Sequence, residues 1–125
     1  MGELNIIYTL ADVTDNEAVT DLREQEFNCR KYLDEMGIVD NIVVLNEAHF
    51  DYERPVLDSL LRLMEKGLVN SVTIKSIHLK LNLEEIKDLL SVAIENLVNV
   101  YVFDLNLASV LSTLITETKE GRFNI

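Results

Sequence analysis

The feature that most constrains the fold is an alternation between short apolar runs and longer segments that carry one apolar stripe. The short runs are "LNIIYT" (4–9), "NIVVL" (41–45), "VNSVTIKS" (69–76) and "NVYVF" (99–103). Their length and their content of β-branched and aromatic residues are typical of strands. The sequence therefore predicts four strands that are separated from one another by longer segments.

The segments between these runs have the residue spacing of helices. Apolar residues recur in 18–36 at steps of three, four and seven, and Gly37 supplies a C-terminal stop. Pro55 fits the first turn of a second helix, which Gly67 ends. Asn82 and Glu85 form a capping-box pattern for a third helix, and a last helix is expected at 108–116. The predicted apolar stripes are Ala18, Leu22, Cys29, Leu33 and Met36 in the first helix, Val56, Leu57, Leu60, Leu61 and Met64 in the second, and Ile86, Leu89, Leu90, Ala93 and Leu97 in the third.

Strands that alternate with helices need crossover connections. Crossovers produce mostly parallel pairing, with helices on both faces of the sheet. We therefore expect residues 1–125 to form a single three-layer α/β domain, with a sheet of four to five strands and the first strand at its centre. Ligands bind such sheets at the carboxyl ends of the strands. The polar residues 12–15 follow the first strand and lie where a site is expected.

The composition narrows the classes of function. The chain has 22 acidic and 11 basic residues and a formal net charge of -11, so nucleic-acid phosphates would repel it unless its bases gathered on one face. Cys29 is the single cysteine, which excludes an intrachain disulfide and suits a reducing cytoplasm. No apolar run approaches a membrane span, and no Gly-rich phosphate loop occurs. We expect a cytoplasmic protein with no cofactor.

The polar residues after the first strand have a structural interpretation and a chemical one. Thr14 and Glu17 form a capping-box pattern, and Asp15 would meet the positive end of the following helix. A divalent cation needs two or three converging carboxylates. Asp12 and Asp15 could supply two, but no acid ends the third strand. We therefore expect a helix cap and no metal.

The other candidates for chemistry stand alone in the sequence. His49 lies in a polar segment, "NEAHFDYERP", and is expected to be solvated. His78 follows the third strand and could act as a general base, but no serine–histidine–acid arrangement can be read around it. Cys29 falls on the apolar stripe of its helix, which favours a small buried side chain over a nucleophile.

Three segments carry a recognisable order and spacing. They are "IIY" in the first strand, "LREQEFNCRKYL" with Gln25 and Cys29, and "ERPVLDSLLRLMEKGLVNSVTI". Together they resemble the catalytic domain of the serine site-specific recombinases, the resolvase/invertase family, over roughly residues 5–104. In that family a short polar loop leads to an Arg-Pro pair at the start of the second helix, and a Gly turn precedes the third strand. Arg54, Pro55 and Gly67 fit that order, so the resemblance implies a resolvase-like fold.

The resemblance also implies where catalytic residues would stand. The first strand of the family ends in Tyr-x-Arg-Val-Ser, whose serine attacks DNA phosphate and whose arginine helps to hold it. Aligned from Tyr8, the arginine position is Leu10 and the serine position is Asp12. With a two-residue insertion, Thr14 would be the nucleophile. The other equivalent positions are Gln25, Asn46 where the family has an acid, Arg54, and Ile77, His78 and Leu81 in the segment that reads Asp-Arg-x-x-Arg in the family.

By this alignment, Arg54 is the one phosphate-binding arginine of the family that the chain retains, and Asp12 stands at the serine position. These replacements bear directly on activity. Phosphoryl transfer depends on positive groups that stabilise charge as it develops on the phosphate oxygens. The sequence thus predicts a recombinase-like domain that is catalytically inactive and works through oligomerisation, as a dimer or tetramer, or through regulation. No DNA-binding module is expected in residues 1–125, so DNA would be bound only in a full-length context. Two alternatives stay open: an active recombinase that uses Thr14, and an unrelated flavodoxin-like binding module.

Overall fold

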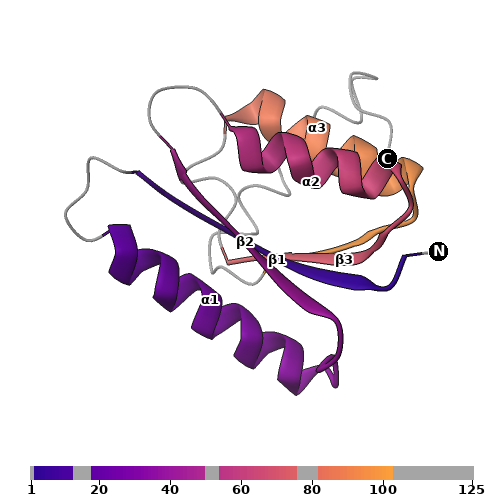
Figure 1. Ribbon diagram of the computed structural model, residues 1–125. Coiled ribbons are helices and arrows are strands. Elements are labelled where there is room, and N and C mark those ends of the chain that lie inside the picture. The colour runs from indigo at the N-terminus through magenta and orange to yellow at the C-terminus, as the bar shows by residue number, and fades with distance from the viewer. Residues whose placement is uncertain (1, 13–17, 50–53, 76–81, 103–125) are drawn as a thin grey trace.

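The computed structural model describes residues 2–12, 18–49, 54–75 and 82–102, which form a parallel sheet between two helical layers (Figure 1). The strands are β1 (Leu4–Asp12), β2 (Ile42–His49), β3 (Val69–Ile74) and β4 (Asn99–Val102). The helices are α1 (Ala18–Glu35), α2 (Pro55–Glu65) and α3 (Leu83–Glu95). The strand order is β2-β1-β3-β4, and each neighbouring pair is parallel. The α/β class, the parallel sheet and the central position of β1 are confirmed.

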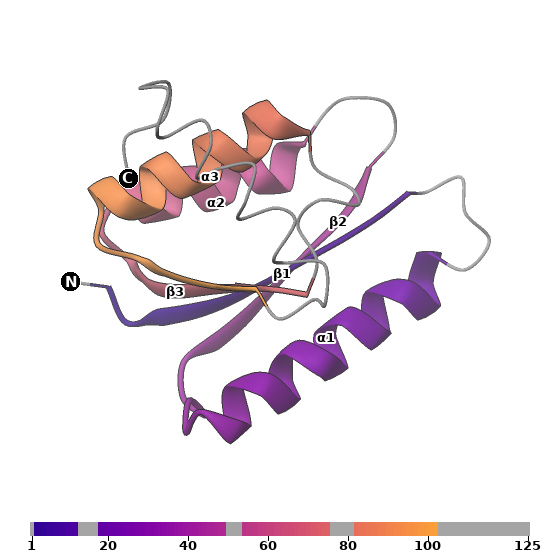
Figure 2. The ribbon, with the colours of Figure 1, turned by 180° about the vertical axis from the view of Figure 1, so that it is seen from behind.

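The two faces of the sheet are covered unequally. Helix α1 lies on one face, and α2 and α3 lie side by side on the other (Figures 1 and 2). The larger hydrophobic core lies beneath α2 and α3, and its fully buried members include Ile6, Leu60, Met64, Val72 and Leu89. On the α1 face the buried cluster consists of Ile7, Cys29 and Leu33. The prediction that Cys29 is a small buried side chain is confirmed.

All three described helices end in the same hydrogen-bonded turn. In α2, the N–H of Gly67 donates to the carbonyl of Met64, and the N–H of Leu68 donates to that of Leu63. Equivalent bonds close α1 and α3, where the residues in the left-handed region are Gly37 and Leu97. This is the Schellman arrangement, which needs a positive φ just after the helix. The glycine stops predicted after α1 and α2 are confirmed.

The third helix ends earlier than the sequence predicted. Leu97 was expected on the inner stripe of α3, but the helix ends at Glu95 and Leu97 is 84% exposed. The reason is its φ of 57°, which turns the backbone out of the helix. The prediction that Met36 is buried is also wrong: it follows the last residue of α1 and is exposed. The capping box of α3, between Asn82 and Glu85, is confirmed.

The first two strands are longer than the sequence predicted. β1 reaches Asp12 and β2 reaches His49, in a register that pairs Thr9 with Asn46 and Asp12 with His49. Residues 46–49 were expected in a polar loop, and this prediction is wrong because the backbone of β1 continues the ladder beside them. Conversely, β3 ends at Ile74, two residues before the expected end. The expected helix at 108–116 lies outside the described residues.

Candidate functional site

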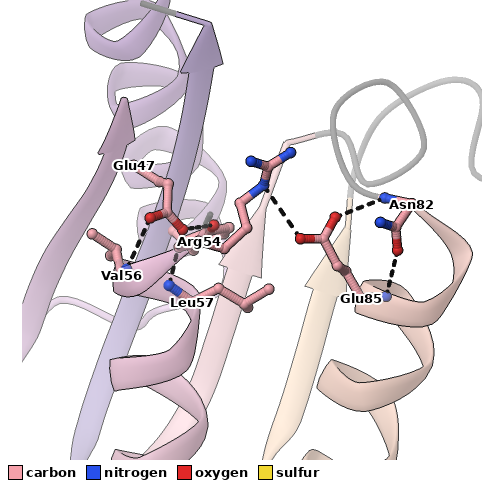
Figure 3. A network of polar contacts seen from close by, with 7 residues as sticks. Glu47, Arg54, Val56, Leu57, Asn82 and Glu85 are labelled. Atoms are coloured by element: carbon pink, nitrogen blue, oxygen red, sulfur yellow. Dashed lines mark hydrogen bonds and ion pairs between the residues drawn. The ribbon is translucent and has the colours of Figure 1, made fainter. Parts of the chain in front are cut away.

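The carboxyl ends of β1 and β2 meet the amino-terminal ends of α2 and α3 at one edge of the sheet (Figures 1 and 3). The side chains that gather there are Tyr8 of β1, Glu47 of β2, Arg54 just before α2, and Glu85 in the first turn of α3. Parallel α/β sheets bind their ligands at this edge. These four residues therefore define the candidate site.

Glu47 is a buried carboxylate that holds the beginning of α2. Its side chain is 1% exposed. Oε2 accepts a hydrogen bond from the N–H of Val56 at 2.8 Å, and Oε1 accepts one from the N–H of Leu57 at 2.9 Å (Figure 3). Both N–H groups lie in the first turn of α2, where no preceding carbonyl of the helix is available to accept them. The carboxylate thus acts as a cap supplied by a neighbouring strand.

Tyr8 completes the coordination of that carboxylate. Its hydroxyl donates to Glu47 Oε1 at 2.5 Å. Burial raises the pKa of the Tyr8 hydroxyl well above its usual value, the hydrogen bond to Glu47 and the charge of Glu47 raise it further, and Arg54 acts in the opposite direction. The hydroxyl therefore stays protonated at neutral pH, where it serves as a hydrogen-bond donor and not as a nucleophile.

Arg54 faces the amino-terminal end of α3. Its Nε lies 3.3 Å from Glu85 Oε2, and the two side chains are 10% and 16% exposed. Glu85 is fixed in turn, since its Oε1 accepts the N–H of Asn82 while Asn82 Oδ1 accepts the N–H of Glu85 (Figure 3). The guanidinium is therefore held against a carboxylate that the capping box of α3 has already positioned.

A shallow groove of about 390 Å³ opens beside this ion pair, between α2 and α3. Its walls include the apolar side chains of Leu57 and Leu61. Among the described residues that line it, Arg54 is the one base, and the acids are Asp58, Glu85 and Asp88. Three carboxylates around one guanidinium make the groove unfavourable for an anion such as phosphate.

The second half of β1 is braced from the α1 side. The Gln25 side chain accepts the N–H of Leu10 at 2.9 Å and donates to the carbonyl of Leu10 at 2.8 Å. Within the described residues, pairing of β1 with β3 extends only to Ile7, so Gln25 satisfies backbone groups that the sheet leaves open there. The Leu10 side chain is 5% exposed and belongs to the core beneath α2 and α3.

Comparison with known proteins gives matches among solved structures. The chain matches the C-terminal catalytic domain of ISC1926 TnpA, an IS607-like serine recombinase, with 23% identity and a TM-score of 0.57, over 91% of this chain and 81% of that one. It matches a serine recombinase from Sulfolobus solfataricus with 17% identity and a TM-score of 0.55, over 98% of this chain and 89% of that one. The fold is that of a serine recombinase catalytic domain.

A third solved structure agrees with this recombinase fold. It is the first open reading frame of transposon ISC1904 from Sulfolobus solfataricus P2, with 18% identity and a TM-score of 0.61, over 97% of this chain and 89% of that one. No protein-family model and no curated protein matches the chain. At these identities the comparison shows a shared fold alone.

The recombinase fold brings some of the predicted site positions together. Leu10 and Gln25 are in direct contact, and Arg54 is the residue just before α2. Asn46 instead accepts a hydrogen bond from the side chain of Thr9, away from Arg54. Asp12 is the last residue of β1. Thr14, Ile77, His78 and Leu81 lie outside the described residues.

Glu47 is the site residue that the sequence did not single out. The resemblance placed the acidic position at Asn46, but in the structure the acid in this part of β2 is its neighbour, Glu47. Strand alternation places Leu45 and Glu47 on one face because β2 continues through His49, a continuation that the sequence did not indicate. A residue paired with Leu10 on that face reaches the beginning of α2.

Proposed function

We propose that this chain is a recombinase-like domain that does not carry out DNA strand exchange and that acts through contacts with other protein chains. The observation that carries the proposal is that Arg54, the arginine retained at a family position, is paired with a carboxylate of the chain itself. Arg54 is held at 3.3 Å by Glu85, in a groove whose other described charged residues are acids. A phosphate group would have to displace a carboxylate that is fixed by its own helix cap.

The apolar residue at the family's arginine position supports the same proposal. Leu10 is buried in the core, and its backbone groups are bound by Gln25. An apolar side chain offers no charge to a phosphate oxygen. Removal of one electrostatic contact to a transition state typically costs about 10²–10³ in rate. With Leu10 at one arginine position and Arg54 already paired, neither of these two described positions offers a free positive charge to a phosphate group.

The proposal extends to partners. The net charge of -11 opposes binding to DNA by this chain alone, so DNA is proposed as a partner only of a longer chain. The expected partner of this domain is a second copy, in a dimer or tetramer, as the resemblance to recombinases implies. Within the described residues, no helix is long and apolar enough to cross a membrane.

The test is a search for a covalent protein–DNA adduct. The purified protein is incubated with supercoiled plasmid and with genomic fragments from its source, and the products are run on denaturing gels. We expect neither cleavage nor an adduct, because the charged groups that stabilise the transition state are lost. Thr14→Ala is the matched variant. An adduct that forms with the wild type and disappears in Thr14→Ala would show an active enzyme and overturn the proposal.

A further inference from the structure

The amino-terminal end of α2 has the elements of an anion site. A helix terminus of this kind presents unpaired N–H groups and a partial positive charge, which together favour phosphate or carboxylate groups. α2 has eleven residues, and Arg54, the residue just before it, adds a full positive charge at the same place. Both elements lie at the carboxyl edge of the sheet (Figure 3).

In this chain both elements are occupied by carboxylates of the protein itself. The N–H groups of Val56 and Leu57 donate to Glu47, at 2.8 and 2.9 Å. Arg54 faces the carboxylate of Glu85. Glu47 comes from β2 and Glu85 from α3, so two separate parts of the fold deliver a negative group to the same corner of α2.

Neither carboxylate is loosely placed. Glu47 is buried and accepts a third hydrogen bond, from Tyr8. Glu85 is 16% exposed, and its second oxygen accepts the N–H of Asn82. A carboxylate that is held in position loses less entropy on pairing than a free anion does, so an external phosphate competes poorly for the same cation.

We propose that Glu47 and Glu85 are built-in anions that fill the positive end of α2 and Arg54, and thereby exclude phosphate groups from this edge of the sheet. The inference deepens the proposed function and rests on it, since it names the residues that close the site to a phosphate substrate. Glu85 is the replaceable half of the pair, because it is partly exposed and serves the helix cap through one oxygen only.

Glu85→Gln separates the charge of Glu85 from its structural role. Glutamine serves the same position of a capping box, so the hydrogen bond from Asn82 is retained while the negative charge opposite Arg54 is removed. Glu84→Gln is the matched control: Glu84 is an exposed acid in the same first turn, and the substitution makes the same change in net charge.

The measurement is a titration with inorganic phosphate, followed by NMR of the Arg54 Nε–H and of the Leu57 amide. We expect Glu85→Gln to bind phosphate about 10- to 100-fold more tightly than the wild type, the range of a charge-assisted hydrogen bond. Glu84→Gln should bind as the wild type does. Addition of Arg54→Gln to Glu85→Gln should remove the gain. Thermal melting of each variant checks that it is folded.

Two outcomes would overturn the inference. One is an equal phosphate affinity of Glu85→Gln and Glu84→Gln. The other needs no variant: a shift of the wild-type Arg54 Nε–H resonance in millimolar phosphate would show that the internal carboxylates do not exclude the anion. The adduct assay is independent of both results, because a wild-type adduct contradicts the proposed function whatever the phosphate titration gives.

Discussion

At the scale of single residues, Glu47 is a buried carboxylate with three hydrogen-bond donors. A charge in an apolar interior is costly unless hydrogen bonds replace its lost hydration. Glu47 has three donors, namely the hydroxyl of Tyr8 and two helix N–H groups. The same bonds join β1, β2 and α2 at a single point. Glu47 is therefore a structural group as well as the occupant of an anion position.

Glu47→Ala should destabilise the fold strongly. The substitution leaves two helix N–H groups and a buried hydroxyl without an acceptor, and we expect the free energy of unfolding to fall by about 2–4 kcal/mol. Tyr8→Phe removes one donor and keeps the helix cap, so its effect should be smaller, about 1–2 kcal/mol. Urea denaturation of the two variants measures both values. A loss from Tyr8→Phe that equals or exceeds that from Glu47→Ala would contradict this assignment.

The sequence carried only part of this information. Arg54 and Pro55 could be placed from their order before an amphipathic helix, and the structure has them at the start of α2. Glu47 could not be assigned to the site from the sequence, because its role depends on the length of β2, and pairing with β1 fixes that length. The pairing of Arg54 with Glu85 could not be predicted either, since the two residues are brought together only when α2 and α3 pack side by side.

At the scale of secondary-structure elements, the three helices offer an internal comparison. Each ends in a Schellman turn with one residue in the left-handed region. Glycine adopts this conformation freely, and it stands there after α1 and α2. Leu97 stands there after α3, where a side chain at Cβ crowds the following carbonyl. The sequence located the two glycine ends correctly and missed the third, because an apolar residue in an apolar stripe gives no sign of a stop.

Leu97→Gly should stabilise the protein. The side chain is 84% exposed, so little packing is lost, and relief of the left-handed strain outweighs the greater freedom of glycine in the unfolded chain. We expect a gain of about 0.5–1 kcal/mol in the free energy of unfolding, measured by urea denaturation. Gly67→Ala is the converse control, since a Cβ there meets no atom within 4 Å and only the backbone angle opposes it. A loss in Leu97→Gly would show that this strain is negligible.

At the scale of the whole molecule, the layer formed by α1 leaves a large aromatic side chain exposed. α1 covers its face of the sheet with a small buried cluster, and its outer surface carries Phe27 at 68% exposure. Phe27 lines a shallow depression with Thr20, Arg23, Glu24 and Asn28. An exposed aromatic ring beside charged and polar groups is typical of residues that anchor protein contacts. This surface is where the proposed second copy would be expected to bind.

Phe27→Asp should reduce self-association. Sedimentation equilibrium of the wild type is expected to give an average mass above the 14.3 kDa of one chain, and Phe27→Asp should move it toward that value. Val39→Asp is the matched control, because Val39 is 62% exposed, and lies between α1 and β2 instead of on the outer face of α1. An equal effect of the two substitutions would mean that added charge alone, and not this surface, governs association.

The parallel order of the strands also governs when the fold can form during synthesis. β1 is made before both of its partners, and the second of these, β3, ends at Ile74. Because a ribosome adds roughly 5–20 residues per second, β1 waits seconds for its sheet neighbours to leave the exit tunnel. Throughout that interval an apolar strand with Ile6 and Ile7 at its centre is open to chaperones and to other nascent chains. The strand whose residues 5–11 are buried in the finished molecule is thus exposed while the chain is still growing.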